Sequence, residues 1–286
     1  MSLRGHFIRW SRATVRLPFS DEGGHKGWFE RFSRAQALVI RKIGVKVAGW
    51  PAGSRSLRVA FLSDFHTGSH SRDIARLRTI VARASDLRPD LVLYGGDYVN
   101  MQLFGGGRVP PRIVAPILAE LRGAVGRFAI LGNHDYSYGA KEVLGAFRES
   151  GIEVLTNERR AISFEGQTIQ VVGIPNARVM PSASHNVLAS PGATPTIVLA
   201  HDPIWFTHVP QGPYLTLAGH THGGQIRLPR VGALVTASRA PKTWAYGLVY
   251  EDGRLLYVTS GIGTSGVPVR IGAPPEIALL EISGVP

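Results

Sequence analysis

Five short polar motifs constrain the fold of this chain more than any other feature of its sequence. In chain order they are Asp64-x-His66, Gly96-Asp97, Gly132-Asn133-His134-Asp135, His201 and Gly219-His220-Thr221-His222. Each motif alone is a weak signal, but four of the five directly follow an apolar run that predicts a buried strand. Open α/β sheets bind their ligands beyond the carboxyl ends of the strands. We therefore expect these side chains to share one site on the loops after the strands.

The first part of the chain alternates predicted strands with predicted helices. Strands are expected at residues 57–63, 90–94 and 127–131. Between the first two, apolar residues at helical spacing predict a helix with Ser71 as its N-cap: Ile74, Leu77, Val81, Ala84 and Leu87. A second helix is expected near residues 113–121. This rhythm predicts a layered α/β fold.

The pattern changes after Ile152, where short alternating runs replace the mixture of strands and helices. These runs predict strands at residues 161–164, 168–173, 196–200, 214–218, 244–250, 255–259 and 276–282. We interpret them as a second, mostly antiparallel sheet that faces the first, with helices outside.

The composition is that of a folded protein without thiolate chemistry. Hydrophobic residues make up 44% of the 286 residues, and there is no cysteine. Any metal must therefore be held by His, Asp, Asn or Glu. Such nitrogen and oxygen ligands suit Mn, Fe, Zn, Ni or Mg.

Most of the net positive charge lies in residues 1–55, which we interpret as a basic N-terminal arm before a catalytic domain at residues 56–286. The arm has eleven Lys or Arg and three acidic residues, a net +8 of the chain's +12. With its aromatic residues, the arm is expected either to lie on an anionic membrane surface or to be a solvated, partly ordered segment. No run of ~18 apolar residues predicts a spanning helix. We expect a cytoplasmic protein, peripheral on the inner face of the membrane where the arm binds it.

Together the five motifs resemble the calcineurin-like metallophosphoesterase family, whose pattern is Asp-x-His, Gly-Asp, Gly-Asn-His-Asp/Glu, His and Gly-His-x-His. The resemblance extends from about Leu57 to the C-terminus, and all five motifs are intact. It implies an α/β fold, a four-layer αββα sandwich of two mixed β-sheets flanked by helices. It also implies a two-metal-dependent hydrolase of phosphoester or pyrophosphate bonds, which acts through a metal-bridging hydroxide.

The same resemblance assigns roles to the motif residues. It implies that one divalent ion is held by Asp64, His66, Asp97 and His222. It implies that Asp97 bridges to a second ion held by Asn133, His201 and His220. Mn is the metal we expect first, with Fe, Zn, Ni or Mg as alternatives.

Two further residues are expected to be catalytic rather than ligands. In the family pattern His134 approaches the phosphate, where an imidazole can stabilise the pentacoordinate phosphorus or protonate the leaving alkoxide. The resemblance implies that Asp135 orients His134.

Within the family, the chain resembles a bacterial membrane-linked phosphodiesterase-like subgroup that includes lipid-headgroup and UDP-2,3-diacylglucosamine hydrolases. The residues behind this resemblance are the stretch from Gly219 to Gln225, Ser260-Gly-Ile-Gly, Pro268-Val-Arg270 and Pro275-Glu276-Ile277. It implies a lipid-linked or nucleotide-sugar-lipid substrate. Arg270 is expected either to bind a phosphate or headgroup through its guanidinium fork or to form a surface salt bridge.

Two other functions are compatible with the same motifs. The first is a cyclic-nucleotide phosphodiesterase or nuclease, since a basic protein can bind nucleic acid. We expect no nucleic acid partner, because the charge lies in the arm and no basic and aromatic residues alternate near the motifs. The second is a non-catalytic binding module that has lost its metals, which the complete ligand set disfavours.

Overall fold

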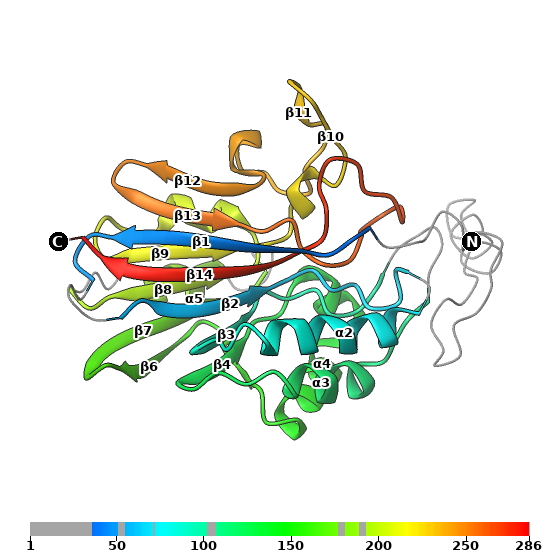
Figure 1. Cartoon of the computed structure of the whole chain (residues 1–286), viewed down its shortest axis with the longest axis horizontal. Helices are drawn as coiled ribbons and strands as arrows, with labels where there is room; N and C mark the ends of the chain where they lie inside the picture. The colour runs from blue at the N-terminus through cyan, green and yellow to red at the C-terminus, as the bar shows by residue number, and fades with distance from the viewer. Residues whose placement is uncertain are drawn as a thin grey trace.

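The computed structural model describes residues 36–50, 55–70, 72–101, 107–176, 181–188 and 193–285. The predicted cap Ser71 and residues 1–35 of the predicted arm lie outside this range. No helix among the described residues has the length and apolarity needed to cross a membrane. Two six-stranded sheets, both of mixed direction, form the centre of the fold (Figure 1).

The first sheet has the order β1-β14-β2-β3-β4-β5. Its strands are β1 (Val39–Val47), β14 (Glu276–Gly284), β2 (Leu57–Leu62), β3 (Leu91–Tyr94), β4 (Gly126–Ala129) and β5 (Glu153–Val154). Neighbouring strands are parallel except β14 and β2. The carboxyl ends of β2, β3 and β4 therefore lie at one edge of this sheet, as the motif positions predicted.

The second sheet has the order β12-β13-β9-β8-β7-β6. Its strands are β12 (Gly247–Glu251), β13 (Arg254–Val258), β9 (Tyr214–Ala218), β8 (Thr196–Ala200), β7 (Gln167–Ile174) and β6 (Glu158–Phe164). Only the two outer pairs are antiparallel, and the three inner pairs are parallel. The prediction of a mostly antiparallel second sheet was therefore wrong. So was the placement of residues 276–282 in it, because β14 pairs with β1 and β2 in the first sheet.

In the described part of the chain, four α-helices accompany the sheets: α2 (Asp73–Ser85), α3 (Pro111–Ala119), α4 (Asn133–Glu149) and α5 (Pro181–Leu188). The first two were predicted, but α4 and α5 were not. The α4 helix begins at Asn133, so the third motif occupies its first turn. Figure 1 shows α2, α3 and α4 together on one side of the molecule. Short 3-10 turns, η1 (Pro203–His208), η2 (His222–Gly224) and η3 (Lys242–Trp244), and a two-stranded hairpin, β10 (Arg227–Leu228) and β11 (Gly232–Ala233), complete the described elements.

Three buried clusters fill the layers of this sandwich. One packs α2, α3 and α4 on the outer face of the first sheet and includes Leu77, Val114 and Phe147. Another lies between the sheets and joins residues such as Val59 and Leu199. The last covers the outer face of the second sheet with α5 and the 3-10 turns. The predicted αββα layering is confirmed, although the fourth layer consists of short elements.

Strand β1 changes the predicted boundary of the N-terminal arm. Residues 39–47 were assigned to the arm, yet they pair in parallel with β14 over their whole length. From Lys42 to Val47 exposed and more buried residues alternate, and Val45 and Val47 reach the core between the sheets. Lys42 and Lys46 are exposed, and these basic residues concealed the strand pattern. The arm itself stays a prediction for residues 1–35.

We expect the catalytic domain to require β1 for its stability. Deletion of residues 1–47 removes the buried side chains of Val45 and Val47, which contribute roughly 1.5 kcal/mol each, and exposes the edge of β14. The melting temperature should fall by about 6–12 °C relative to a deletion of residues 1–35. Calorimetry of both variants checks this, and equal melting temperatures would show that β1 is dispensable.

Candidate metal centre

All seven candidate ligands follow strands of the two sheets, on loops or at the first residue of a helix. From the first sheet come Asp64 and His66 after β2, Asp97 after β3, and Asn133 after β4. From the second sheet come His201 after β8, and His220 and His222 after β9. The structure thus brings together side chains that are up to 158 positions apart, from Asp64 to His222. Most are buried, and Asp64, His66 and His201 have no exposed surface.

The carboxylate of Asp97 lies at the centre of this cluster. Its Oδ2 is 3.5 Å from Nε2 of His66 and 3.4 Å from Nε2 of His201. His66 comes from the first sheet and His201 from the second, so one carboxylate oxygen faces imidazoles from both. This is the position that a bridging ligand between two ions needs.

Two groups of side chains extend on either side of Asp97. In the first, the Nε2 atoms of His66 and His222 are 3.1 Å apart, and Nε2 of His222 is 3.6 Å from Oδ1 of Asp64. In the second, Nε2 of His201 is 3.1 Å from Oδ1 of Asn133. The ligand atoms of Asp64, His66 and His222 lie within 4.8 Å of one another, as do those of Asp97, His201 and His220. Each group could hold one ion.

The imidazole nitrogens of the centre are oriented toward a common point. Nδ1 of His201 lies 2.7 Å from the carbonyl oxygen of Gly95, which can only accept a hydrogen bond. Nδ1 therefore carries a hydrogen, and Nε2 faces the centre. Burial lowers the pKa of His201, but the Asp97 carboxylate outweighs this effect and raises the pKa to about 10, so a divalent ion at Nε2 would displace a proton. Burial lowers the pKa of His66 and of His222 well below the usual value, so both rings are neutral. Convergent imidazole nitrogens and carboxylate oxygens form a donor set for divalent cations.

The backbone of the centre is held in conformations that are rare outside glycine. Asp64, His66, Asp97, His220 and His222 all have positive φ, between 39° and 66°. Such left-handed residues cost free energy and persist only where the surrounding structure holds them. Five candidate ligands in this state indicate that the loops are fixed for ligand geometry rather than for local backbone preference.

The motif glycines allow these loops to approach one another. A Cβ on Gly132 would lie 2.1 Å from Oδ1 of Asp97, and a Cβ on Gly219 would lie 2.3 Å from Oδ2 of Asp64. Neither distance is possible for real atoms. Glycine is required at both positions because the backbone passes directly against the candidate ligands.

His134 lies beside the centre, half-buried at the start of α4. Its backbone N–H donates to Oδ1 of Asp97 at 2.8 Å, and its ring meets the ring of His66 edge-on with centroids 4.6 Å apart. Within the described part of the chain, its buried Nδ1 has no hydrogen-bond partner. His134 also converges with His66 and Asp97 within 4.8 Å. The geometry allows His134 to contact either substrate or metal, and its catalytic role stays a prediction.

Asp135 acts on the loops rather than on the His134 ring. Its carboxylate accepts from the backbone N–H groups of Asp97 at 2.8 Å, Tyr98 at 2.9 Å and Gly132 at 2.8 Å. Among the described residues, these backbone groups are its hydrogen-bond partners, and none belongs to the His134 imidazole. The structure therefore differs from the expectation that Asp135 orients His134 directly. Asp135 instead ties the loop after β3 to the first turn of α4.

Arg270 is buried, so the expected surface salt bridge was wrong. The guanidinium donates from Nε to the carbonyl oxygen of Gly263 at 2.9 Å and from Nη1 to that of Ala273 at 3.0 Å. It also faces His222, with Nη1 3.4 Å from the carbonyl oxygen and Nη2 3.4 Å from Nδ1. Burial lowers its pKa to about 9. These contacts position His222 and the loop around it, and a phosphate-binding role stays a prediction.

Two acidic residues support the centre and were not singled out from the sequence as site residues. The Oδ2 of Asp202 lies 3.7 Å from Nε2 of His220, while its Oδ1 accepts from Ser238 Oγ at 2.5 Å. Fully buried Glu276 accepts hydrogen bonds from Tyr257 and Thr259 at 2.7 and 2.9 Å. It thereby fixes the turn before Gly261, which packs on Asp64. The available signals were the position of Asp202 directly after His201 and the Pro275-Glu276 pair.

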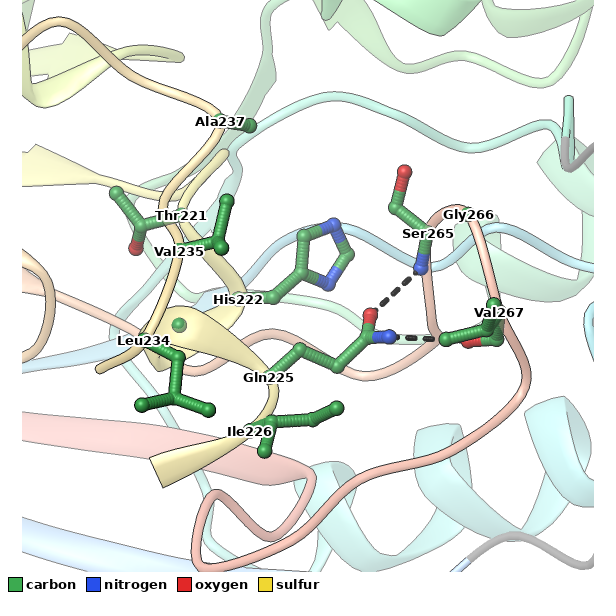
Figure 2. A pocket seen from close by; sticks show the side chains of 11 residues that line it. Thr221, His222, Gln225, Ile226, Leu234, Val235, Ala237, Ser265, Gly266 and Val267 are labelled. Carbon is green, nitrogen blue, oxygen red and sulfur yellow. Dashed lines mark hydrogen bonds between the residues drawn. The ribbon is translucent and has the colours of Figure 1, made fainter. Parts of the chain in front are cut away.

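An apolar pocket opens beside His222. Its volume is about 390 Å³, and it is lined by Thr221, His222, Gly224, Gln225, Ile226, Leu234, Val235, Ala237, Ser265, Gly266 and Val267. Figure 2 shows the His222 ring between the Val235 side and the Ser265 side of the pocket. The side chain of Gln225 accepts from the N–H of Ser265 at 2.8 Å and donates to the carbonyl oxygen of Val267 at 2.9 Å. The polar atoms of Gln225 are thus used to close one wall.

We expect Gly132→Ala to lose metal, because the added methyl group displaces the Asp97 carboxylate. Metal content measured by mass spectrometry after equilibration should fall from two ions toward one or none, and the melting temperature should fall as well. Gly145→Ala in the same helix is the matched control, since its Cβ meets nothing within 4 Å. That variant should be stabilised by about 0.5–1 kcal/mol. A Gly132→Ala protein with two tightly bound ions would contradict this role for glycine.

Comparison with known proteins agrees with the site. Residues 57–224 match the family model described as calcineurin-like phosphoesterase. Phosphodiesterase YaeI of Escherichia coli is 30% identical over 289 residues, which cover 99% of this chain and all of that protein. The uncharacterized metallophosphoesterase YkuE of Bacillus subtilis is 26% identical and covers 98% of this chain and 97% of its own length. The chain therefore belongs to the calcineurin-like phosphoesterase family, and its buried His and Asp groups make it a metal-dependent phosphoesterase.

Proposed function

We propose that the chain hydrolyses a phosphoester or pyrophosphate bond in a substrate that carries an apolar, lipid-like group. The observation that carries this proposal is the apolar pocket beside His222. A phosphate bound at the metal centre would place its substituent in reach of this pocket. The phosphodiesterase name of the relative YaeI supports a diester as the first bond to test.

The lining of the pocket favours an apolar group over a nucleoside. Ile226, Leu234, Val235 and Val267 line its walls. Apart from His222, the lining contains no ionisable side chain, and it contains no aromatic ring on which a base could stack. Burial of an acyl chain against such walls is driven by the hydrophobic effect, at about 0.8 kcal/mol per methylene group. A cyclic nucleotide or nucleic acid would find neither stacking nor charge there.

The metal ions, when bound, supply electrostatic stabilisation of the reacting phosphoryl group. We propose that Asp64, His66, Asp97 and His222 hold one ion, and that Asp97, Asn133, His201 and His220 hold the other. The all-nitrogen-and-oxygen donor set supports a divalent ion, with Mn as the first to test. We propose that His134 donates a proton or hydrogen bond to the substrate, which its Nδ1, buried without a partner in the described range, supports.

Two variants separate the bridging role of Asp97 from the catalytic role of His134. Asp97→Asn should lose at least one ion and nearly all activity, because the carboxylate serves both groups. His134→Ala should keep both ions but lower kcat by ~10²-fold or more. Metal analysis and turnover of a soluble diester are measured on the same samples. An Asp97→Asn enzyme with two ions, or activity of His134→Ala restored by excess metal, would overturn the respective role.

The substrate proposal is tested with a soluble aryl diester and a short-chain acylated diester that stays monomeric. Val235→Asp puts a charge into the wall of the pocket, so kcat/KM for the acylated diester should fall roughly tenfold or more. The aryl diester should be affected less than about twofold. Leu248→Asp, on β12 away from the pocket, is the matched control. Equal losses on both diesters would show that the pocket does not bind the apolar group.

A further inference from the structure

The exposed apolar residues of this protein are gathered on one surface next to the metal centre. Seven of the ten large hydrophobic side chains that are exposed in the described part of the chain lie in residues 226–235 and 265–272. They are Leu228, Val231, Leu234, Val235, Val267, Val269 and Ile271. We call these two segments the platform. Apolar surface concentrated in this way marks a binding surface rather than a random distribution.

The platform is built by hydrogen bonds between its two segments. Ile226 and Ile271 form a parallel bridge, in which the N–H of Arg227 donates to the Ile271 carbonyl at 2.8 Å and the N–H of Ile271 donates to the Gln225 carbonyl at 2.9 Å. Figure 1 shows the β10–β11 hairpin projecting from the body of the molecule. The exposed side chains therefore belong to two segments that are joined by hydrogen bonds, and the hairpin carries some of them out from the body of the molecule, where a partner can contact them.

The charge of this surface has one sign. Residues 226–243 and 259–275 contain no Asp or Glu. The first of these ranges carries Arg227, Arg230, Arg239 and Lys242, and none of the four forms an ion pair with a described residue. Three of them, Arg230, Arg239 and Lys242, are exposed. The surface is therefore both apolar and cationic.

Beneath the hairpin lies a second cavity of about 880 Å³. Arg41, Arg227 and Arg230 contribute to its lining. The guanidinium groups of Arg41 and Arg227 lie over the ring of Tyr246, at 5.4 and 5.0 Å from its centroid. The Nε of Arg41 also donates to the buried Glu276 carboxylate at 3.2 Å. Arg227 and Arg230 are therefore the guanidinium groups of this open cavity that fit an anionic phosphate group, which accepts paired hydrogen bonds from arginine.

We propose that the platform docks on the surface of an anionic phospholipid membrane. Its valine and leucine side chains enter the boundary between headgroups and acyl chains, and its arginines bind lipid phosphates. The pocket beside His222 shares Leu234, Val235 and Val267 with the platform, so it opens toward the membrane. The metal centre is thereby presented to molecules in the lipid surface.

Two other occupants fit the platform less well. A second copy of the chain would place these cations against each other, with no acidic residue in either segment to pair with them. A nucleic acid would leave the exposed valines in contact with water or phosphate, and the platform has no aromatic side chain for base stacking. An anionic membrane satisfies both the apolar and the cationic side chains.

The test uses the full chain and sedimentation with vesicles of phosphatidylglycerol mixed with phosphatidylcholine, or of phosphatidylcholine alone. The wild-type protein should sediment with the anionic vesicles, and added salt should weaken this binding. Val231→Glu combined with Val269→Glu should reduce the vesicle partition coefficient at least about tenfold. Neither residue lines the pocket beside His222. The matched control, Leu248→Glu with Tyr250→Glu on exposed β12, makes the same charge change and should bind as the wild type does.

Several outcomes would overturn the proposal. One is wild-type protein that stays in the supernatant. Another is a Val231→Glu/Val269→Glu variant that still sediments fully, because vesicle binding would then not require the platform. A wild-type dimer in the absence of vesicles that this variant dissociates would assign the surface to a second copy. A further outcome is displacement of the protein from anionic vesicles by an oligonucleotide. If the oligonucleotide binds the wild type and the Val231→Glu/Val269→Glu variant with equal affinity, the vesicle binding belongs to another surface. Vesicle binding is measured without turnover. A failure of the membrane proposal can therefore be distinguished from a failure of the proposed substrate class.

Discussion

The Asp97 carboxylate is the interaction on which the rest of the site depends. Its Oδ2 lies within 3.5 Å of an imidazole from each sheet, so it links the loops of two separately hydrogen-bonded layers. A buried carboxylate is costly in a low-dielectric interior unless a cation or hydrogen bonds compensate it. Part of this compensation comes from the backbone N–H of His134, and divalent ions held by these side chains would add to it. Metal binding and the packing of the two sheets are thus coupled.

The surrounding loops carry the conformational strain that this arrangement requires. Five candidate ligands adopt left-handed backbone conformations, and glycines at 132 and 219 leave room for the carboxylates. Asp135 and Glu276 then fix the loops through several hydrogen bonds each. Such strained, highly constrained backbone is expected where geometry matters more than local stability. The supporting residues preorganise the centre, although none of them reaches a reacting atom.

The surface beside the centre has a different physical character. The pocket wall formed by Leu234, Val235 and Val267 continues into the exposed platform, while the centre itself is polar and buried. A substrate with a phosphate at one end and an apolar group at the other would match this surface, with the phosphate at the polar centre and the apolar group in the pocket. The proposed substrate and the proposed membrane surface therefore follow from two adjoining features, and each can fail without the other.

Much of the site was predictable from the sequence because it depends on local order along the chain. A polar motif directly after an apolar run, as at Asp64 after β2 and His201 after β8, places a ligand at the end of a strand in any open α/β sheet. The resemblance to the metallophosphoesterase motifs then predicted the two-sheet sandwich. Strand partners and burial were decided only by tertiary structure, since they depend on residues far away in sequence. Alternation predicted a strand at residues 276–282, but only packing placed β14 beside β1 and β2. In the same way, the sequence showed only that Arg270 and Asp135 carry charge. In the folded chain Arg270 donates to backbone carbonyl groups rather than to a surface partner. Asp135 accepts from backbone N–H groups rather than from the His134 ring.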